Sequence, residues 1–215
     1  MSDSITTQDL RRRPVDDFDD IGRILDNLSK HEPMRHGLET PFLELAARGT
    51  AFVTFAYDID GVSMEIAKYG AALGQLFANA EYQPVIHVVG GNFGEKADVV
   101  LDSAWKRHVI ANTDGWSKWE DGKWFSRLFY EDMPEKSEVS GKLAGEMWHR
   151  AMDIAEQLVT FVLDNEIGLL IPVNINSNPG NFSLALAFVL ASEVTGCPVL
   201  NNNHDYYWEG GKRSS

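Results

Sequence analysis

The sequence predicts an α/β protein built on a doubly wound parallel sheet, with a helical arm at its amino end. Apolar runs at 51–57, 84–89, 169–173 and 197–200 alternate with helical patterns. That alternation is the order expected of β-α-β units with right-handed crossovers. The run at 169–173 is continuously apolar, as in a parallel strand that is covered on both faces.

The overall composition limits the class of protein. The chain has 215 residues, 44% of them hydrophobic, and a formal net charge of −13. This acidity argues against a nucleic-acid partner, because phosphate contacts need clustered Lys and Arg. The single cysteine, Cys197, excludes an intrachain disulfide and is expected to be a small core residue. Without a membrane-length apolar run or a signal-peptide core, the chain is expected to be cytoplasmic.

Residues 1–49 are expected to form the helical arm, and residues 50–215 the α/β domain. Within the arm, apolar residues at helical spacing predict an amphipathic helix over 16–30. A second helix is expected over 41–47, closed by Gly49. The arm is expected to lie on the main domain and to take no part in chemistry.

The first β-α-β unit follows directly. A strand is predicted at 51–57, a tight turn at 58–63 and a helix over 64–78. The second strand at 84–89 ends in the glycine-rich segment 90–94, which we interpret as a loop in preference to a ligand site.

The middle of the chain is richer in aromatic residues. Short strands are predicted at 99–101 and 108–111, and turn signals at 114–115 and 121–122 favour a β-hairpin insertion. A satellite core is the default interpretation of its tryptophans, and carbohydrate stacking is the alternative. These tryptophans are Trp105, Trp116, Trp119 and Trp124.

Two helices are predicted in the second half. Apolar spacing predicts a long helix over 135–164, broken near Gly141 or Gly145. A shorter helix over 184–194 is expected to stop at Gly196, a common residue at helix ends.

A first polar cluster follows the strand at 169–173. It lies at the carboxyl edge of the sheet, where open α/β sheets bind ligands. Its amides and hydroxyl can donate and accept hydrogen bonds, which suits a polyhydroxyl ligand, although asparagines are also common in turns. The cluster contains Asn174, Asn176, Ser177 and Asn178.

A second polar cluster follows the strand at 197–200 at the same edge. It contains Asn203, His204 and Asp205 and continues into aromatic residues. An imidazole beside a carboxylate can hold sugar hydroxyls or take part in proton transfer, and a structural histidine is the alternative. No metal site is predicted, because the histidine spacings match no common ligand motif.

The turn at 58–63 is a further candidate site. Main-chain N–H groups of Gly61, Val62 and Ser63 at a helix start favour a phosphate or a developing oxyanion. Gly61 as a residue that merely permits the turn is the alternative. The glycine fingerprints of dinucleotide and NTP sites are missing, which argues against a nicotinamide-dependent oxidoreductase.

Two stretches resemble a known family. FVTFAYDIDGVSMEIAKY (52–69) looks like the first strand, glycine turn and helix of the N-terminal domain of family-4 retaining nucleotide-sugar glycosyltransferases. PVLNNNHDYYWE (198–209) resembles the H-H-D-F-Y-W-E stretch of a subgroup of that family. The family has two Rossmann-like domains, the GT-B fold. The resemblance therefore implies that 50–215 is the N-terminal, acceptor-side domain, and that the C-terminal donor-binding domain is absent from this chain.

The resemblance also implies an activity and roles for residues. The family transfers a sugar from a nucleotide-sugar donor to a hydroxyl acceptor with retention, and no further cofactor is expected. By match to the family, Gly61 lies beside the donor's phosphates, His204 against the transferred sugar, and Asp205 supports that loop. Asn174 and Asn176 face the acceptor.

The missing domain has consequences for the isolated chain. The chain alone is expected to be inactive, and to expose a face that binds the C-terminal domain or a second copy as a homodimer. The alternative function is a stand-alone, non-catalytic α/β carbohydrate-binding or interaction module.

Overall fold

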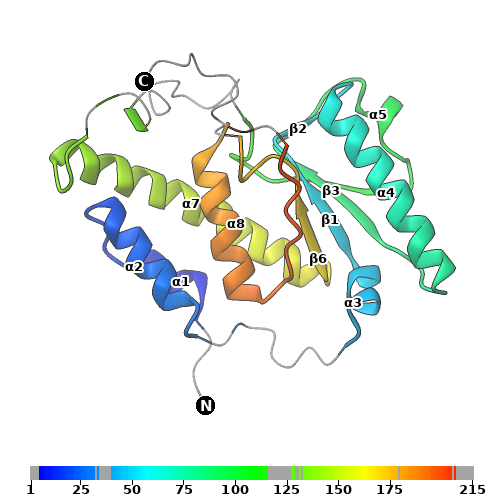
Figure 1. The fold of residues 1–215 in the computed structure, drawn as a ribbon, viewed down its shortest axis with the longest axis horizontal. Coiled ribbons are helices and arrows are strands. Elements are labelled where there is room, and N and C mark those ends of the chain that lie inside the picture. The colour runs from blue at the N-terminus through cyan, green and yellow to red at the C-terminus, as the bar shows by residue number, and fades with distance from the viewer. Residues whose placement is uncertain are drawn as a thin grey trace.

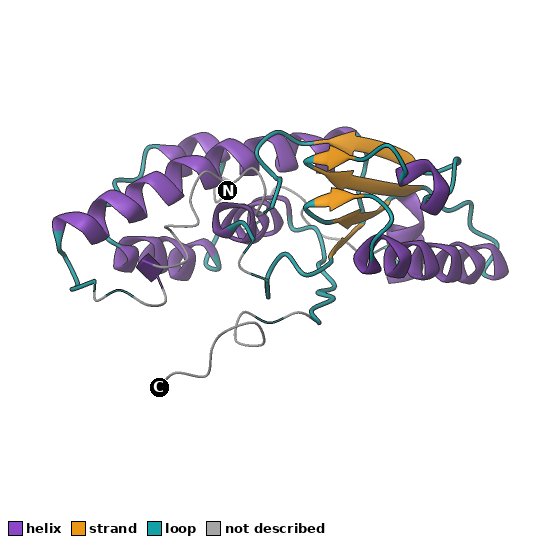
Figure 2. Cartoon of the chain, turned by 90° about the horizontal axis from the view of Figure 1, so that it is seen from above, coloured by secondary structure: helices purple, strands orange, loops and turns teal. Residues whose placement is uncertain are grey.

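The structure is a computed structural model, which describes residues 5–31, 33, 40–115, 127–128, 131, 133–178, 180–204 and 206. At its centre lies a parallel four-stranded sheet in the order β5-β3-β1-β6. The strands are β1 (Thr50–Val53), β3 (Ile86–Gly90), β5 (Lys106–Val109) and β6 (Leu169–Pro172). Helices lie on both sides of these strands (Figures 1 and 2).

The strand predicted at 197–200 extends the sheet beyond β6. It is present as two isolated parallel bridges, which join Leu170 to Val199 and Val173 to Asn202. The main-chain segment that leads to His204 therefore runs along β6 and leaves the sheet at its carboxyl edge.

The strand order makes the sheet doubly wound. From β1 the chain moves outward to β3 and β5, and then returns to the other side of β1 to form β6. Helices α4 (Gly61–Asn79) and α5 (Ala97–Val100) lie on one face, and α7 (Glu138–Asp164) and α8 (Phe182–Thr195) on the other (Figure 1). The direction reverses between β1 and β6, so the crevice where such sheets bind ligands lies at their carboxyl ends. The predicted α/β class and parallel sheet are confirmed.

The alternation of side chains along β1 creates two hydrophobic cores. Ala51 and Val53 belong to the core that α7 and α8 cover, whereas Phe52 belongs to the core beneath α4. All three side chains are fully buried. A strand that is apolar on both faces is the pattern expected of a covered parallel sheet.

Helix α7 is continuous, so the predicted break near Gly141 or Gly145 is wrong. A Cβ atom at Gly141 would lie 2.6 Å from the main-chain oxygen of Asp16. A Cβ atom at Gly145 would lie 3.7 Å from the main-chain oxygen of Val15, which is an ordinary contact. Gly141 therefore lets the segment before α2 approach α7 closely, and neither glycine interrupts the helix.

The described part of the amino-terminal arm contains three helices. They are α1 (Thr7–Arg11), α2 (Phe18–Leu28) and α3 (Phe42–Arg48), of which the last two were predicted. Leu10 of α1 and Ile21 of α2 are buried in the core that contains α7 and α8. Asp17 caps α2, and its carboxylate accepts a hydrogen bond from the hydroxyl of Ser140 in α7. Buried contacts therefore fix the arm to the α/β layers.

Two strand predictions need correction. The strand expected at 51–57 is divided into β1 and β2 (Ala56–Tyr57), and β2 pairs with β4 (Asn92–Phe93) in a separate two-stranded sheet. The segment 99–101, expected as a strand, lies mainly in helix α5. Its apolar run is short, and short apolar runs do not distinguish strand from helix.

The aromatic insertion is only partly described. Trp105 is half-buried and packs against Gly70 of α4, where a Cβ atom would meet its indole ring. This contact fits the satellite-core interpretation for that one tryptophan. The other three tryptophans and the second turn of the predicted hairpin lie outside the described residues.

Two further expectations concern the burial of Cys197 and the presence of membrane spans. Cys197 is 3% exposed, as expected for a core residue, and its thiol donates to the carbonyl oxygen of Ile167. None of the helices within the described ranges has both the length and the apolar run needed to cross a bilayer.

Candidate functional site

Three segments meet at the carboxyl edge of the sheet. The loop after β6 carries Asn174, the segment beyond the Val199 bridge carries His204, and the first turns of α4 carry Glu65. Hydrogen bonds join His204 to both other residues. The two polar clusters that the sequence placed at one edge are therefore in direct contact.

His204 pairs with a residue that the sequence analysis did not select. Its Nε2 atom lies 2.6 Å from Oε2 of Glu65. The other carboxylate oxygen of Glu65 accepts a hydrogen bond of 2.7 Å from the hydroxyl of Tyr69, four residues further along α4. The side chain of His204 is 36% exposed and that of Glu65 27% exposed, so both groups reach the surface of the site.

Asn174 holds His204 from the other side. Its Oδ1 accepts a hydrogen bond of 2.9 Å from the main-chain N–H of His204, and its Nδ2 lies 3.3 Å from Nδ1 of the imidazole. Asn174 is 2% exposed and has a φ of 61°, a left-handed conformation that asparagine tolerates better than most residues. Asn174 therefore combines a turn conformation with direct hydrogen bonds to His204.

The remaining predicted asparagines surround this cluster. Nδ2 of Asn176 donates to Oδ1 of Asn201, which links the two loops a second time. The main-chain N–H of Asn178 donates to the carbonyl oxygen of Asn174. Oδ1 of Asn203 is buried and has no hydrogen-bond partner among the described residues. Asp205, the other predicted catalytic residue, lies outside them.

The turn before α4 is only partly available to a ligand. The main-chain N–H of Ser63 donates to the carboxylate of Asp60, the residue that caps α4, at 2.7 Å. The hydroxyl of Ser63 accepts a hydrogen bond from the main chain of Asp58. The Ser63 N–H proposed for an anion is therefore used by a carboxylate, whose charge opposes a second anion there.

Gly61 itself is not required by the turn. It is the first residue of α4 and is not among the residues with a positive φ. A Cβ atom at this position would meet no atom within 4 Å. The space in front of Gly61 is therefore open, and the geometry of this chain alone does not account for the glycine. Val62, next to it, is half-buried against the α4 core.

The glycine-rich segment 90–94 has a structural explanation. A Cβ atom at Gly91 would meet Asp114, and one at Gly94 would meet the carboxylate of Asp58. Both glycines let neighbouring loops pack closely. The interpretation of 90–94 as a loop is nevertheless wrong in part, because Gly90 ends β3 and Asn92–Phe93 form β4, which pairs with β2.

The sequence contained only a partial signal for Glu65. Glu65 follows Gly61 by four residues and precedes Tyr69 by four, so the three positions share one face of α4. That face points toward the predicted site because α4 begins at the carboxyl edge. The partner of His204 depended on which helix lies beside the 201–204 segment, and this is a property of the sheet order.

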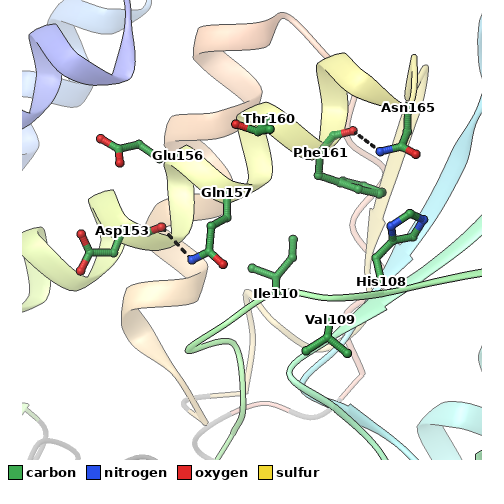
Figure 3. Close-up of a pocket in the computed structure, with 9 residues that line it drawn as sticks. All are labelled: His108, Val109, Ile110, Asp153, Glu156, Gln157, Thr160, Phe161 and Asn165. Atoms are coloured by element: carbon green, nitrogen blue, oxygen red, sulfur yellow. Dashed lines mark hydrogen bonds between the residues drawn. The ribbon is translucent and has the colours of Figure 1, made fainter.

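Two pockets of similar size are present in the described part of the chain. One, of about 410 Å³, borders the cluster at Tyr69 and Asn202, and Phe52, Leu73 and Ile171 are among its apolar lining residues. The other, of about 420 Å³, lies between β5 and α7 and contains His108 and Gln157 (Figure 3).

The pocket beside His108 is bordered by groups that already have partners. Gln157 donates to the main-chain oxygen of Asp153, as Figure 3 shows. The carboxylates of Asp153 and Glu156 both pair with Arg11 of α1, at 2.7 and 2.8 Å. These acids therefore hold the arm against α7, and this pocket lies away from the predicted carboxyl-edge site.

A second histidine cluster lies beside that pocket. Nδ1 of His87 lies 2.9 Å from Nε2 of His108, and both rings pack edge-on against Phe161. Burial, with further contributions from His108 and Lys106, lowers the pKa of His87 to about 4. Burial and then Lys106 also lower the pKa of His108. Both rings are therefore neutral near pH 7. His87 is fully buried, whereas His108 is half-buried and lines the pocket.

The described parts of the chain contain no group of three or more His, Cys, Asp or Glu side chains arranged to hold a metal ion. Comparison of the chain with protein-family models, curated proteins and solved structures gives no match.

Proposed function

We propose that this chain is the acceptor-side half of a retaining glycosyltransferase, in which His204 contacts the transferred sugar. One observation carries the proposal. The two stretches that resemble the family, 52–69 and 198–209, lie far apart in the sequence, yet Glu65 and His204 form a direct contact between them. This contact lies at the carboxyl edge, where open α/β sheets bind ligands.

The polar groups of the cluster support a sugar ligand. Asn176 provides an exposed amide, and His204 provides an imidazole that is 36% exposed. Such groups match the hydroxyls of a sugar because each side of the pair can donate and accept. The open space in front of Gly61 also agrees with a ligand that approaches the main chain there.

The negative charges near the start of α4 imply that a diphosphate site there needs cations from a second domain. The start of α4 carries Asp58 and Asp60, and Asp60 already caps the helix. Carboxylates at this position disfavour a diphosphate unless cations are supplied from elsewhere. In the proposal these cations belong to the donor-binding domain that the family uses, and the present chain positions the acceptor hydroxyl.

The test is a transfer assay with a panel of nucleotide sugars and hydroxyl acceptors, run with and without a supplied C-terminal donor-binding domain. We expect product only when both parts are present. His204→Ala should lower the rate by at least about 100-fold while the circular dichroism spectrum stays unchanged, because misplacement of a reacting group costs about that much. The matched control is His149→Ala, an exposed histidine on α7.

Two results would count against this proposal. A normal transfer rate in His204→Ala would remove the assigned role of that residue. Sugar binding by the chain without transfer in any combination would favour the alternative, a non-catalytic carbohydrate-binding module.

A further inference from the structure

The hydrogen bonds around His204 determine which ring nitrogen carries the proton. The main-chain N–H of His204 can only donate, so the atom of Asn174 that lies 2.9 Å from it is the amide oxygen. The other end of that amide is then the NH₂ group, which donates to Nδ1 of the imidazole at 3.3 Å. Nδ1 is therefore an acceptor, and the proton of the neutral ring is on Nε2.

Glu65 completes this arrangement. With the proton on Nε2, the ring donates to Oε2 of Glu65 at 2.6 Å, which is shorter than the 3.3 Å between Nδ1 and the amide of Asn174. Hydrogen bonds that involve a charged acceptor are shorter and stronger than neutral ones. Glu65 thus contributes more than Asn174 to the choice of tautomer.

Tyr69 fixes the carboxylate in turn. Its hydroxyl donates to Oε1 of Glu65 at 2.7 Å, and both residues are on α4. The hydrogen bond to Glu65, together with the charge of that carboxylate, raises the pKa of Tyr69, so the phenol keeps the proton that it donates. Both oxygens of the Glu65 carboxylate are therefore hydrogen-bonded, one to Tyr69 on the same helix and the other to the ring of His204.

We propose that Glu65 is the positioning residue of this site: it holds His204 as the Nε2–H tautomer and so presents Nδ1 as the acceptor for a hydroxyl of the transferred sugar. This inference rests on the proposed function for the identity of the ligand. A sugar hydroxyl would replace the longer hydrogen bond, from Asn174, and leave the shorter one to Glu65 in place. His204 then orients the sugar and transfers no proton.

The tautomer can be measured without any donor or acceptor. Long-range ¹H–¹⁵N spectra of the labelled chain, recorded on the alkaline plateau of the ring titration, distinguish a protonated ring nitrogen from an acceptor nitrogen. His204→Ala identifies the His204 signals. In the wild-type chain we expect Nδ1 with an acceptor shift and Nε2 with a protonated shift.

Three variants test the role of Glu65. In Glu65→Ala the two nitrogen shifts should move toward each other, because both tautomers become populated. In Glu65→Gln they should stay close to the wild-type values, since the amide oxygen still accepts from Nε2. Glu146→Ala, an exposed glutamate on α7 across the sheet, is the matched control and should change nothing.

The result that overturns the inference differs from the result that overturns the proposed function. An Nδ1–H tautomer in the wild-type chain, or an unchanged spectrum in Glu65→Ala, would show that Glu65 does not position the ring. In the transfer assay, Glu65→Ala should lower kcat at least about tenfold and Glu65→Gln should restore most of it. Failure of every transfer assay would leave the tautomer result standing and remove only the glycosyltransferase assignment.

Discussion

The chain contains two histidine clusters whose surroundings differ in nearly every respect. His87 and His108 lie on neighbouring strands within the α7 face of the sheet, and their partners are each other and the ring of Phe161. His204 lies at the carboxyl edge between a carboxylate and an amide. The side chain of His204 is 36% exposed, whereas His87 is fully buried.

The difference shows what determines whether a histidine is available for function. His87 and His108 are neutral because burial, complete for His87 and partial for His108, lowers the pKa of both rings. An imidazole in that environment fills space like an aromatic residue, and a ligand cannot reach His87. At the edge, an acid and an amide orient the ring of His204 while part of it stays open to a ligand. We therefore expect the first cluster to affect stability and the second to affect function.

The largest expected effect is on the buried cluster. His87→Ala should lower the free energy of unfolding by about 3–4 kcal/mol, because it leaves a cavity between β3 and α7 and removes the partner of His108. His204→Ala, the counterpart at the edge, should lower it by less than about 1 kcal/mol. Urea unfolding of the two variants measures both values. Equal losses would break the distinction between the clusters.

Acid should destabilise the wild-type chain through the buried ring of His87. The pKa of His87 is lowered from 6.5 to about 4 in the folded state, so the unfolded chain binds a proton more readily between these values. Stability should be complete above pH 6.5 and fall as the pH drops toward 4, by up to about 3 kcal/mol from this residue. Unfolding midpoints in urea across this range give the slope.

A second variant at position 87 provides the control for the acid experiment. His87→Leu removes the titrating ring, so its stability should depend less on pH between 6.5 and 4. A wild-type slope in His87→Leu would mean that other groups cause the acid sensitivity.

The fold was largely predictable because its signals are local. The apolar run of β6 and the glycine that ends α8 were sufficient to place those elements, and Gly196 has the expected positive φ of 67°. The continuity of α7 was not predictable, since Gly141 is explained by the carbonyl oxygen of Asp16, a residue far away in the sequence. A single sequence does not distinguish a glycine that interrupts a helix from one that lets another segment of the same chain pack closely against the helix.

The site was predictable only in part, for a similar reason. Asn174 and His204 follow strands, so their place at one edge follows from the order of the elements. Glu65 contacts His204 only because α4 begins beside the edge at which residues 201–204 leave the sheet. No spacing in the sequence specifies that approach.

The smallest expected effects concern the two hydrogen bonds between the side chain of Asn174 and His204. Two variants at this position distinguish their contributions to stability. Asn174→Ala should cost about 2 kcal/mol, because it removes the acceptor for the main-chain N–H of His204 and places alanine at a φ of 61°. Asn174→Asp keeps that acceptor and tolerates the left-handed conformation, so it should cost less than about 1 kcal/mol. Asn176→Ala, an exposed amide in the same loop, should cost about 0.5 kcal/mol and serves as the control.

If the aspartate variant lost as much stability as the alanine variant in urea unfolding, the NH₂ group facing the imidazole would hold this loop. His204 would then be needed for the structure of the edge as well as for its ligand, and the contrast with His87 would be one of degree.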